Sequence, residues 1–412
     1  MSFRLTRRLM LGASLLLCGV GSASAAEVIK LGVLAPLSGN AAADGQEMVR
    51  GAQLAVDELN AAGGVGGYTF EVVVGDTKDQ DSNAVMAAFE RLSGDKQVHA
   101  MMTAYASGSN FEIQSMAENS MPYLISANSA QTRDIISKDP ASYPTVWSLT
   151  PSYDAYETGV LPFLQKLATD GNVAFKSKKL ALIGSDNPYS KTIYNGIKKS
   201  FTGAGWTVTV DEMVPFGQVN DWRAILAKVR SDPPDVIVNT DYLPANEATF
   251  LQQFIEAPTN SLLFLQYAPS VPEFVKLTAD KSTGVLYNLL AGPILSAKAT
   301  KAKEIDDKFK AKFGVEPGSA GVALYEEVMI YRDALKKVGK PDDHIAIGAA
   351  LGATDKQTSL GTIAFDPATH LAKQGDDFVP LQFYQLWKGD RVMLSPQQFA
   401  TGTFQLPPWM KK

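Results

Sequence analysis

Short apolar runs alternate with amphipathic helical patterns along the chain from Val28 onward. The runs predict buried strands, and apolar positions recurring three and four residues apart predict the helices between them. The predicted strands are Val28–Ala35, Phe70–Val74, Val98–Met102 and Tyr123–Ser126, and the predicted helices start near Asp44 and cover Ser82–Leu92 and Phe111–Glu118. A run of β-α units predicts a parallel sheet covered by helices on both faces.

The pattern restarts near Pro151, which predicts a second α/β domain of similar size. Its predicted helices are Tyr156–Leu167, Lys191–Phe201, Trp222–Val229 and Asn246–Ile255, and its predicted strands are Leu180–Ser185, Trp206–Val210, Val236–Asn239 and Leu262–Gln266. Beyond Gly284 we expect a strand, two helices and two antiparallel strands, at Val285–Leu290, around Ile305–Phe313, at Val322–Val338, at Phe383–Trp387 and at Val392–Leu394.

The N-terminus has the pattern of a secretory signal peptide. Met1–Arg8 is basic, Leu9–Val20 is apolar but too short to span a bilayer, and Ala23-Ser24-Ala25 matches an A-x-A cleavage site. We therefore predict export and cleavage near Ala26, with Sec and twin-arginine routes both open. The only cysteine, Cys18, lies in this leader, so the mature chain would have no disulfide and no thiolate metal site.

Charge narrows the class of partner. The 412 residues include 38 basic and 43 acidic ones, and removal of the leader with its three arginines moves the net charge from −5 to −8. An acidic chain without a basic cluster argues against nucleic acid or an anionic membrane as the main partner. We expect a soluble exported protein.

The sequence has no pattern of a catalytic nucleophile, cofactor fingerprint or metal site. His99, His344 and His370 are scattered and lack metal-ligand spacing. No G-x-S-x-G elbow, Walker loop or G-x-G-x-x-G fingerprint follows a predicted strand. The acids of Asp76–Asp81 lack the central glycine and terminal glutamate of a calcium loop. We therefore predict no cofactor and no enzymatic activity, and an unrecognised hydrolase site stays open as an alternative.

Polar and aromatic side chains gather where predicted strands end. They are Tyr105, Ser107, Asn128 and Ser129 in the first domain, and Tyr189, Asp241 and Tyr267 in the second. Ligands of open parallel sheets bind beyond the carboxyl ends of the strands, where helix N-termini offer free N–H groups. Two such edges facing one another would make an interdomain cleft suited to a small molecule.

Three runs, Leu31–Gly39, Gly51–Gly67 and Met121–Ser126, resemble the periplasmic leucine/isoleucine/valine-binding proteins. The resemblance covers essentially the whole mature chain. It implies a type I periplasmic-binding-protein fold, with two doubly wound parallel-sheet lobes joined by a three-strand hinge. We assign residues 1–25 to a signal peptide, 26–150 plus 290–358 to the first lobe, and 151–289 plus 359–412 to the second.

The resemblance also implies roles for single residues. Ser107 matches the serine that holds the ligand carboxylate, Ser129 lies in the second ligand loop, and Tyr189 matches a ring on the second lobe's wall. Two departures concern the ligand: Ala130 replaces the family's threonine, and the acid that balances an ammonium is replaced near Tyr267.

A buried ammonium without a carboxylate partner is costly. Asp44 stands near the place where the amino acid binders carry a tyrosine. Either Asp44 or Asp241 therefore balances the ammonium, or the ligand is not an α-amino acid.

The leading hypothesis is a periplasmic, monomeric solute-binding protein of an ABC importer, which delivers a small polar metabolite to a membrane permease. Amino acids, amides, urea and aromatic carboxylates are ligands of such relatives. Hinged closure over the ligand follows from the cleft geometry. An amide or amino acid sensor that feeds a regulator is the second alternative.

Overall fold

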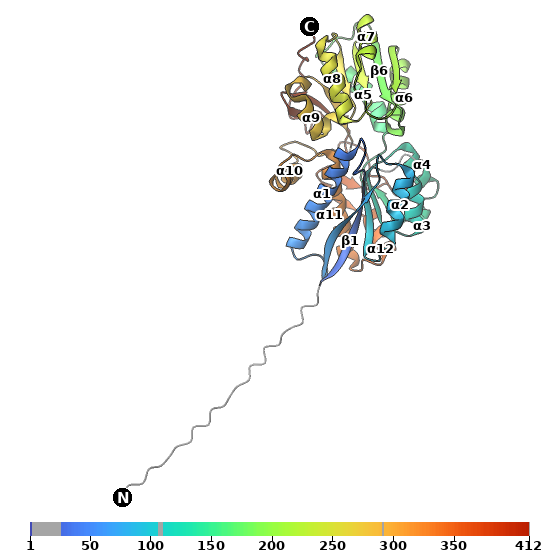
Figure 1. Ribbon diagram of the computed structural model, residues 1–412, viewed down its shortest axis with the longest axis vertical. Coiled ribbons are helices and arrows are strands. Elements are labelled where there is room, and N and C mark those ends of the chain that lie inside the picture. The colour runs from blue at the N-terminus through green and yellow to red at the C-terminus, as the bar shows by residue number, and fades with distance from the viewer. Residues whose placement is uncertain (2–25, 106–109, 291, 412) are drawn as a thin grey trace.

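The computed structural model of the chain describes residues 1, 26–105, 110–290 and 292–411. Its helices and strands form two α/β lobes, which lie one above the other in Figure 1. We call the lobe built on the five-stranded sheet the first lobe and the lobe built on the seven-stranded sheet the second. The predicted fold class, two parallel-sheet lobes, is confirmed.

The first lobe contains a five-stranded sheet of order β2-β1-β3-β4-β5. Neighbouring strands are all parallel. The strands are β1 (Glu27–Ala35), β2 (Tyr68–Asp76), β3 (Val98–Tyr105), β4 (Tyr123–Ala127) and β5 (Val146–Ser148). Central strands such as β3 are buried on both faces, which is why they read as continuous apolar runs.

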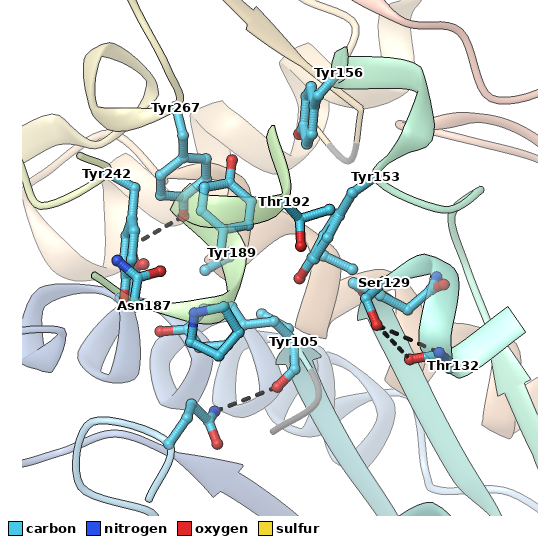
Figure 2. A pocket seen from close by; sticks show the side chains of 18 of the residues that line it. Tyr105, Ser129, Thr132, Tyr153, Tyr156, Asn187, Tyr189, Thr192, Tyr242 and Tyr267 are labelled. Carbon is cyan, nitrogen blue, oxygen red and sulfur yellow. Dashed lines mark hydrogen bonds between the residues drawn. The ribbon is translucent and has the colours of Figure 1, made fainter. Parts of the chain in front are cut away.

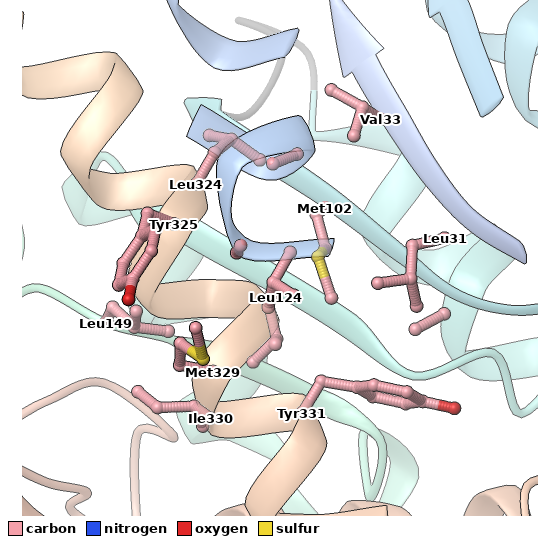
Figure 3. Close-up of a cluster of buried hydrophobic side chains, with 14 of the residues drawn as sticks. Leu31, Val33, Met102, Leu124, Leu149, Leu324, Tyr325, Met329, Ile330 and Tyr331 are labelled. Atoms are coloured by element: carbon pink, nitrogen blue, oxygen red, sulfur yellow. The ribbon is translucent and has the colours of Figure 1, made fainter. Parts of the chain in front are cut away.

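Helices cover both faces of this sheet. One face packs against α1 and α11 in a cluster that includes Leu31, Met102, Leu124 and Met329 (Figure 3). The other face packs against α2 and α3 through residues such as Phe89. The helices are α1 (Ala42–Ala61), α2 (Ser82–Ser93), α3 (Phe111–Glu118), α4 (Ala130–Lys138), the short η1 (Pro140–Ser142), α11 (Ser319–Val338) and α12 (His344–Gly352).

The second lobe contains a seven-stranded sheet of order β14-β13-β10-β9-β8-β6-β7. The strands from β10 to β7 are parallel, and β13 and β14 are antiparallel, as predicted for the C-terminal pair. The strands are β6 (Lys179–Ser185), β7 (Thr207–Val214), β8 (Val236–Asn239), β9 (Leu262–Leu265), β10 (Leu286–Leu289), β13 (Gln382–Trp387) and β14 (Asp390–Ser395).

Two hydrophobic clusters, one on each face of this sheet, form the second lobe's core. Its helices are α5 (Asp154–Thr169), α6 (Pro188–Gly203), α7 (Arg223–Ser231), α8 (Pro244–Glu256), α9 (Pro272–Thr278), η2 (Ala268–Ser270) and η3 (Ala279–Ser282). α10 (Thr300–Phe313) follows in the chain, but its Ile305 and Phe309 join the first lobe's cluster.

The chain crosses between the lobes three times. It crosses between β5 and α5, between β10 and α10, and again before β13. A small hairpin of β11 (Asp355–Thr358) and β12 (Gly361–Ala364) precedes the third crossover. The lobe boundaries stay predictions, and the packing of Leu360, Ile363 and Val379 in the first lobe's cluster favours a third boundary near residue 380 rather than 359.

Candidate ligand-binding site

A cavity of about 630 Å³ lies between the two lobes. It is lined from the carboxyl ends of β3 and β4 and from the first turns of α1, α4 and α6. Its polar and aromatic lining includes Asp44, Tyr105, Asn128, Ser129 and Thr132 from the first lobe, and Tyr153, Tyr156, Asn187, Tyr189, Phe216, Tyr242 and Tyr267 from the second. Figure 2 labels most of these side chains.

The turn after β4 is fixed by its own polar side chains. Nδ2 of Asn128 donates to Oγ of Ser148 at 2.6 Å and to the Thr150 carbonyl at 3.2 Å, and Asn128 is fully buried. Oγ of Ser129 accepts from the Thr132 N–H at 3.3 Å and caps α4. Asn128 therefore holds the loop, and Ser129 directs the N-terminus of α4 at the cavity.

A second helix start lies on the opposite wall. Oδ1 of Asn187 accepts from the Ser190 N–H at 2.9 Å, and Pro188 occupies the first position of α6. Tyr189 consequently sits in the first turn of α6. Its hydroxyl accepts from Nε2 of Gln266 at 3.2 Å.

Aromatic rings make up much of the second lobe's wall. The rings of Tyr153 and Tyr189 meet at 90° with centroids 5.1 Å apart, and those of Tyr189 and Tyr242 meet at 80° with centroids 5.3 Å apart. Phe216 stacks on Tyr242 with centroids 6.2 Å apart. The three tyrosine rings therefore form a corner and do not stack into a layer (Figure 2).

Tyr267 projects from a strained turn. It has φ of 69° and ψ of −54°, and the Ala268 N–H donates to the Gln266 carbonyl at 2.8 Å. This is a γ-turn of the rare, strained kind. The Tyr267 hydroxyl donates to Oδ1 of Asp44 at 3.1 Å, so this hydrogen bond joins the second lobe to the first.

Asp44 is the deeply buried carboxylate of the cavity wall, with 5% of its surface exposed. Burial raises its pKa from 3.8 to about 7, and the neighbouring carboxylates of Glu47 and Glu273 act in the same direction. The hydroxyls of Tyr267 and Tyr105 oppose the shift. Near neutral pH the Asp44 carboxyl is therefore divided between its protonated and ionised forms.

Sequence comparison assigns the family. The sequence model described as "Periplasmic binding protein" matches residues 28–386. The chain belongs to the periplasmic binding protein family. A binding protein of this family presents its ligand site between two lobes, and the cavity described above lies in that position.

Curated relatives align with this chain in sequence over most of their length. The Leu/Ile/Val-binding protein homolog 8 of Brucella suis is 28% identical over 86% of this chain and 88% of the relative. The Leu/Ile/Val-binding protein homolog 7 of Brucella melitensis is 25% identical over 94% of this chain and 96% of the relative. The predicted resemblance to the leucine/isoleucine/valine-binding proteins is confirmed.

Solved structures agree with the fold. A crystal structure from Silicibacter pomeroyi, provisionally described as a branched-chain amino acid ABC transporter, matches with a TM-score of 0.81 and 28% identity, over 93% of this chain and 100% of that one. The substrate-binding protein LivJ of Streptococcus pneumoniae, crystallised with isoleucine, matches with a TM-score of 0.73 and 22% identity, over 90% and 100%. The second likeness supports the fold alone.

The cavity of this binding protein brings together most of the residues singled out from the sequence. Tyr105, Asn128, Ser129, Tyr189, Asp44 and Tyr267 all line it. Ser107 lies outside the described residues. Whether each lining residue contacts a ligand stays a prediction.

Asp241 is not among the lining residues; its neighbour Tyr242 is. Its Oδ2 accepts from Nδ2 of Asn246 at 2.8 Å, and its Oδ1 accepts from the Leu243 N–H at 3.1 Å. Burial raises the pKa of Asp241 to about 6, and these two hydrogen bonds oppose the rise. The carboxyl group thus orders the start of α8 from behind the wall.

Sequence reasoning missed several lining aromatic residues. Tyr153 and Tyr156 belong to the start of α5, just after the first crossover, and Phe216 follows β7. The strand-end rule could have included Phe216, because it lies two residues beyond Val214. The tyrosines of α5 gave no strand-end signal, since they lie in a helix that enters the second lobe.

In the described part of the chain, no group of three or more His, Cys, Asp or Glu residues could hold a metal ion. His99 lies 3.4 Å from the carboxylate of Asp342, and its ring meets that of His344 edge to face; none of these three residues lines the cavity. A search of the helices within the described ranges found none with the length and apolarity needed to cross a membrane.

Proposed function

We propose that this chain is the solute receptor of an ABC importer, which captures a small metabolite in the cavity between its lobes and presents the closed form to a membrane permease. The observation that carries the proposal is the cavity itself. It is about 630 Å³ in volume, it lies at the carboxyl ends of two facing sheets, and both lobes line it. Family membership supports the same role.

Closure works through the three crossovers. A ligand first contacts one lobe, and the other lobe then swings over it by rotation about the connecting segments. The ligand stabilises the closed form only as far as it contacts that form better than the open one. Tyr267 and Asp44 meet across the cavity, so they are suited to make contacts that exist only after closure.

The relatives point to small polar ligands. Several of them are named Leu/Ile/Val-binding proteins, and LivJ was crystallised with isoleucine. We propose that Ser107, Ser129, Tyr105, Tyr189, Asp44 and Tyr267 contact the ligand, that Asn128 holds the loop before Ser129, and that Asp241 acts from behind the wall. We further propose cleavage of the leader near Ala26, a monomeric state and release of the ligand without chemical change.

Two measurements test this proposal together. A thermal-shift screen of amino acids, amides, urea and aromatic acids should give a stabilising compound, since a ligand at 100 times its Kd adds about 2.7 kcal/mol of stability. Small-angle scattering should then show compaction with that compound, and chromatography should recover it intact. Identical scattering curves with and without every stabilising compound would refute hinged capture, and turnover would indicate an enzyme.

A further inference from the structure

The charge of the cavity wall favours a particular class of ligand. Its described lining contains four acids, Asp44, Asp79, Asp81 and Asp186, and no lysine, arginine or histidine. The four neighbouring residues outside the described set, 106–109, are Ala-Ser-Gly-Ser and carry no charge. The wall therefore offers no side-chain cation to balance an anionic ligand, and it offers negative charge to a cationic one.

Three of these acids already have structural partners. Asp186 forms an ion pair with Lys191. Oδ1 of Asp79 accepts from the Ala41 N–H at 2.9 Å and Oδ2 from the Asn40 amide at 3.1 Å. Asp81 caps α2 by accepting from the Ala84 N–H at 3.0 Å. All three carboxylates therefore have partners without a ligand, although only Asp186 is paired with a cation.

Asp44 differs from the other three. It is 5% exposed, it accepts from Tyr267, and it forms no ion pair within the described residues. Beside it lies the hydroxyl of Tyr105, whose oxygen is buried. A buried carboxylate without a cation is costly, and a positively charged ligand would offset that cost.

The rings around the cavity suit a particular kind of cation. Tyr153, Tyr189 and Tyr242 meet at nearly right angles and form a corner, and Phe216 supports Tyr242. A cation within about 6 Å of a ring centroid is attracted by the ring's negative face. A quaternary trimethylammonium group has no N–H that needs an acceptor, so a wall of tyrosine rings can surround it without leaving a donor unpaired.

We propose that the cavity binds a ligand with a methylated ammonium group, which sits against the tyrosine corner and takes Asp44 as its counter-ion. This inference rests on the proposed function, because it names the ligand class of the same receptor. The proposed ligand class differs from leucine, isoleucine and valine, the amino acids that appear in the names of the relatives.

The test is calorimetric titration of the purified mature protein with three methylated ammonium compounds: choline, glycine betaine and carnitine. Leucine and the uncharged carbon isostere of choline (dimethylbutanol) are titrated beside them. We expect at least one methylated ammonium compound to bind and the isostere not to bind. If choline binds, the isostere is the matched control, because it has the same shape as choline and lacks the positive charge.

Variants separate charge from structure. Asp44→Asn should weaken binding of the methylated ammonium compound about thirtyfold or more, because the substitution removes the counter-ion of a buried pair. Asp170→Asn, at an exposed acid outside the cavity lining that already pairs with Lys166, should leave affinity within about threefold. Tyr242→Leu should cost about tenfold, and Tyr242→Phe should cost little because the ring face remains.

The outcomes discriminate the two proposals. Binding of a methylated ammonium with the Asp44 and Tyr242 effects supports the inference. Compaction with leucine or another compound that has no methylated ammonium, with no binding of the three methylated ammonium compounds, overturns the inference and leaves the receptor function standing. Absence of compaction with any compound of either set overturns the receptor function, and the inference falls with it.

Discussion

The buried carboxyl of Asp44 makes folding stability depend on pH in a direction that can be predicted. The perturbation is Asp44→Asn, which keeps the shape of the side chain and removes its charge. In the wild type, burial and the carboxylates of Glu47 and Glu273 raise the pKa to about 7, against the hydroxyls of Tyr267 and Tyr105. The ordinary value for this carboxyl is 3.8.

The size of the effect follows from that shift. Three pKa units at about 1.4 kcal/mol each correspond to about 4 kcal/mol of folding free energy. Because the folded pKa is the higher one, the folded state keeps a proton that the unfolded state releases between about pH 4 and 7. Stability is therefore highest on the acid side of this window and is lost as the pH rises to 7.

The assay is urea denaturation of wild type and Asp44→Asn, without ligand, at four pH values from about 4.5 to 8. We expect the variant's advantage in unfolding free energy to grow across this range, toward about 4 kcal/mol where the ligand-free cavity stays closed and to a smaller value where it opens and returns Asp44 to water. Asp186→Asn, exposed and paired with Lys191, is the control and should give a nearly constant difference. A flat or falling Asp44→Asn difference would show that Asp44 does not carry a buried charge.

Three further substitutions test the loops and the helix packing. Ser107→Ala should weaken ligand binding about tenfold, since a hydrogen bond to a charged group is worth about 1.5–3 kcal/mol, and an unchanged Kd in calorimetry would remove Ser107 from the site. Asn128→Ala should lower the unfolding free energy by about 1–3 kcal/mol in urea titration, because it leaves the buried Ser148 hydroxyl and Thr150 carbonyl without their amide donor. In Gly51→Ala the new Cβ would lie 1.8 Å from the Gly321 carbonyl oxygen of α11, so we expect a loss of about 3 kcal/mol, whereas Gly203→Ala, with nothing within 4 Å, should change the melting temperature little.

The fold was predictable where burial is uniform. Central strands such as β1, β3 and β8 are buried on both faces, so each appears as one apolar run. The prediction was too short at β7, which continues through Asp211 and Glu212 to Val214. β7 is the edge strand of its sheet, so alternate side chains reach solvent and can be charged.

Elements without an apolar stripe of their own were missed. β5 has three residues, too few to show a period. α12 has the sequence HIAIGAALG, which is apolar on nearly every side and therefore gives no helical face to detect. Such a helix is held by what it packs against, here α11, and the sequence alone does not say which neighbour that is.

The site was predictable in position more than in detail. The strand-end rule located Tyr105, Asn128 and Ser129, because the carboxyl ends of parallel strands share one edge of a sheet. It singled out Asp241 and not its neighbour Tyr242, because adjacent residues of an extended segment point to opposite sides and a strand end alone does not say which side chain faces the cavity. The structure has the ring of Tyr242 at the cavity and the carboxyl of Asp241 behind it.

The contact between Asp44 and Tyr267 links ligand charge to closure. Asp44 belongs to the first lobe and Tyr267 to the second, so bringing them to 3.1 Å also removes the carboxylate from water. An empty closed cavity would bury that charge without a cation, which disfavours closure above pH 7. A ligand cation beside Asp44 reverses the balance, because it stabilises the ionised carboxylate in the closed form more than in the open one. On this reasoning the affinity for a cationic ligand falls about tenfold for each pH unit below the pKa of Asp44 in the ligand-free protein, whereas the affinity for an uncharged ligand does not.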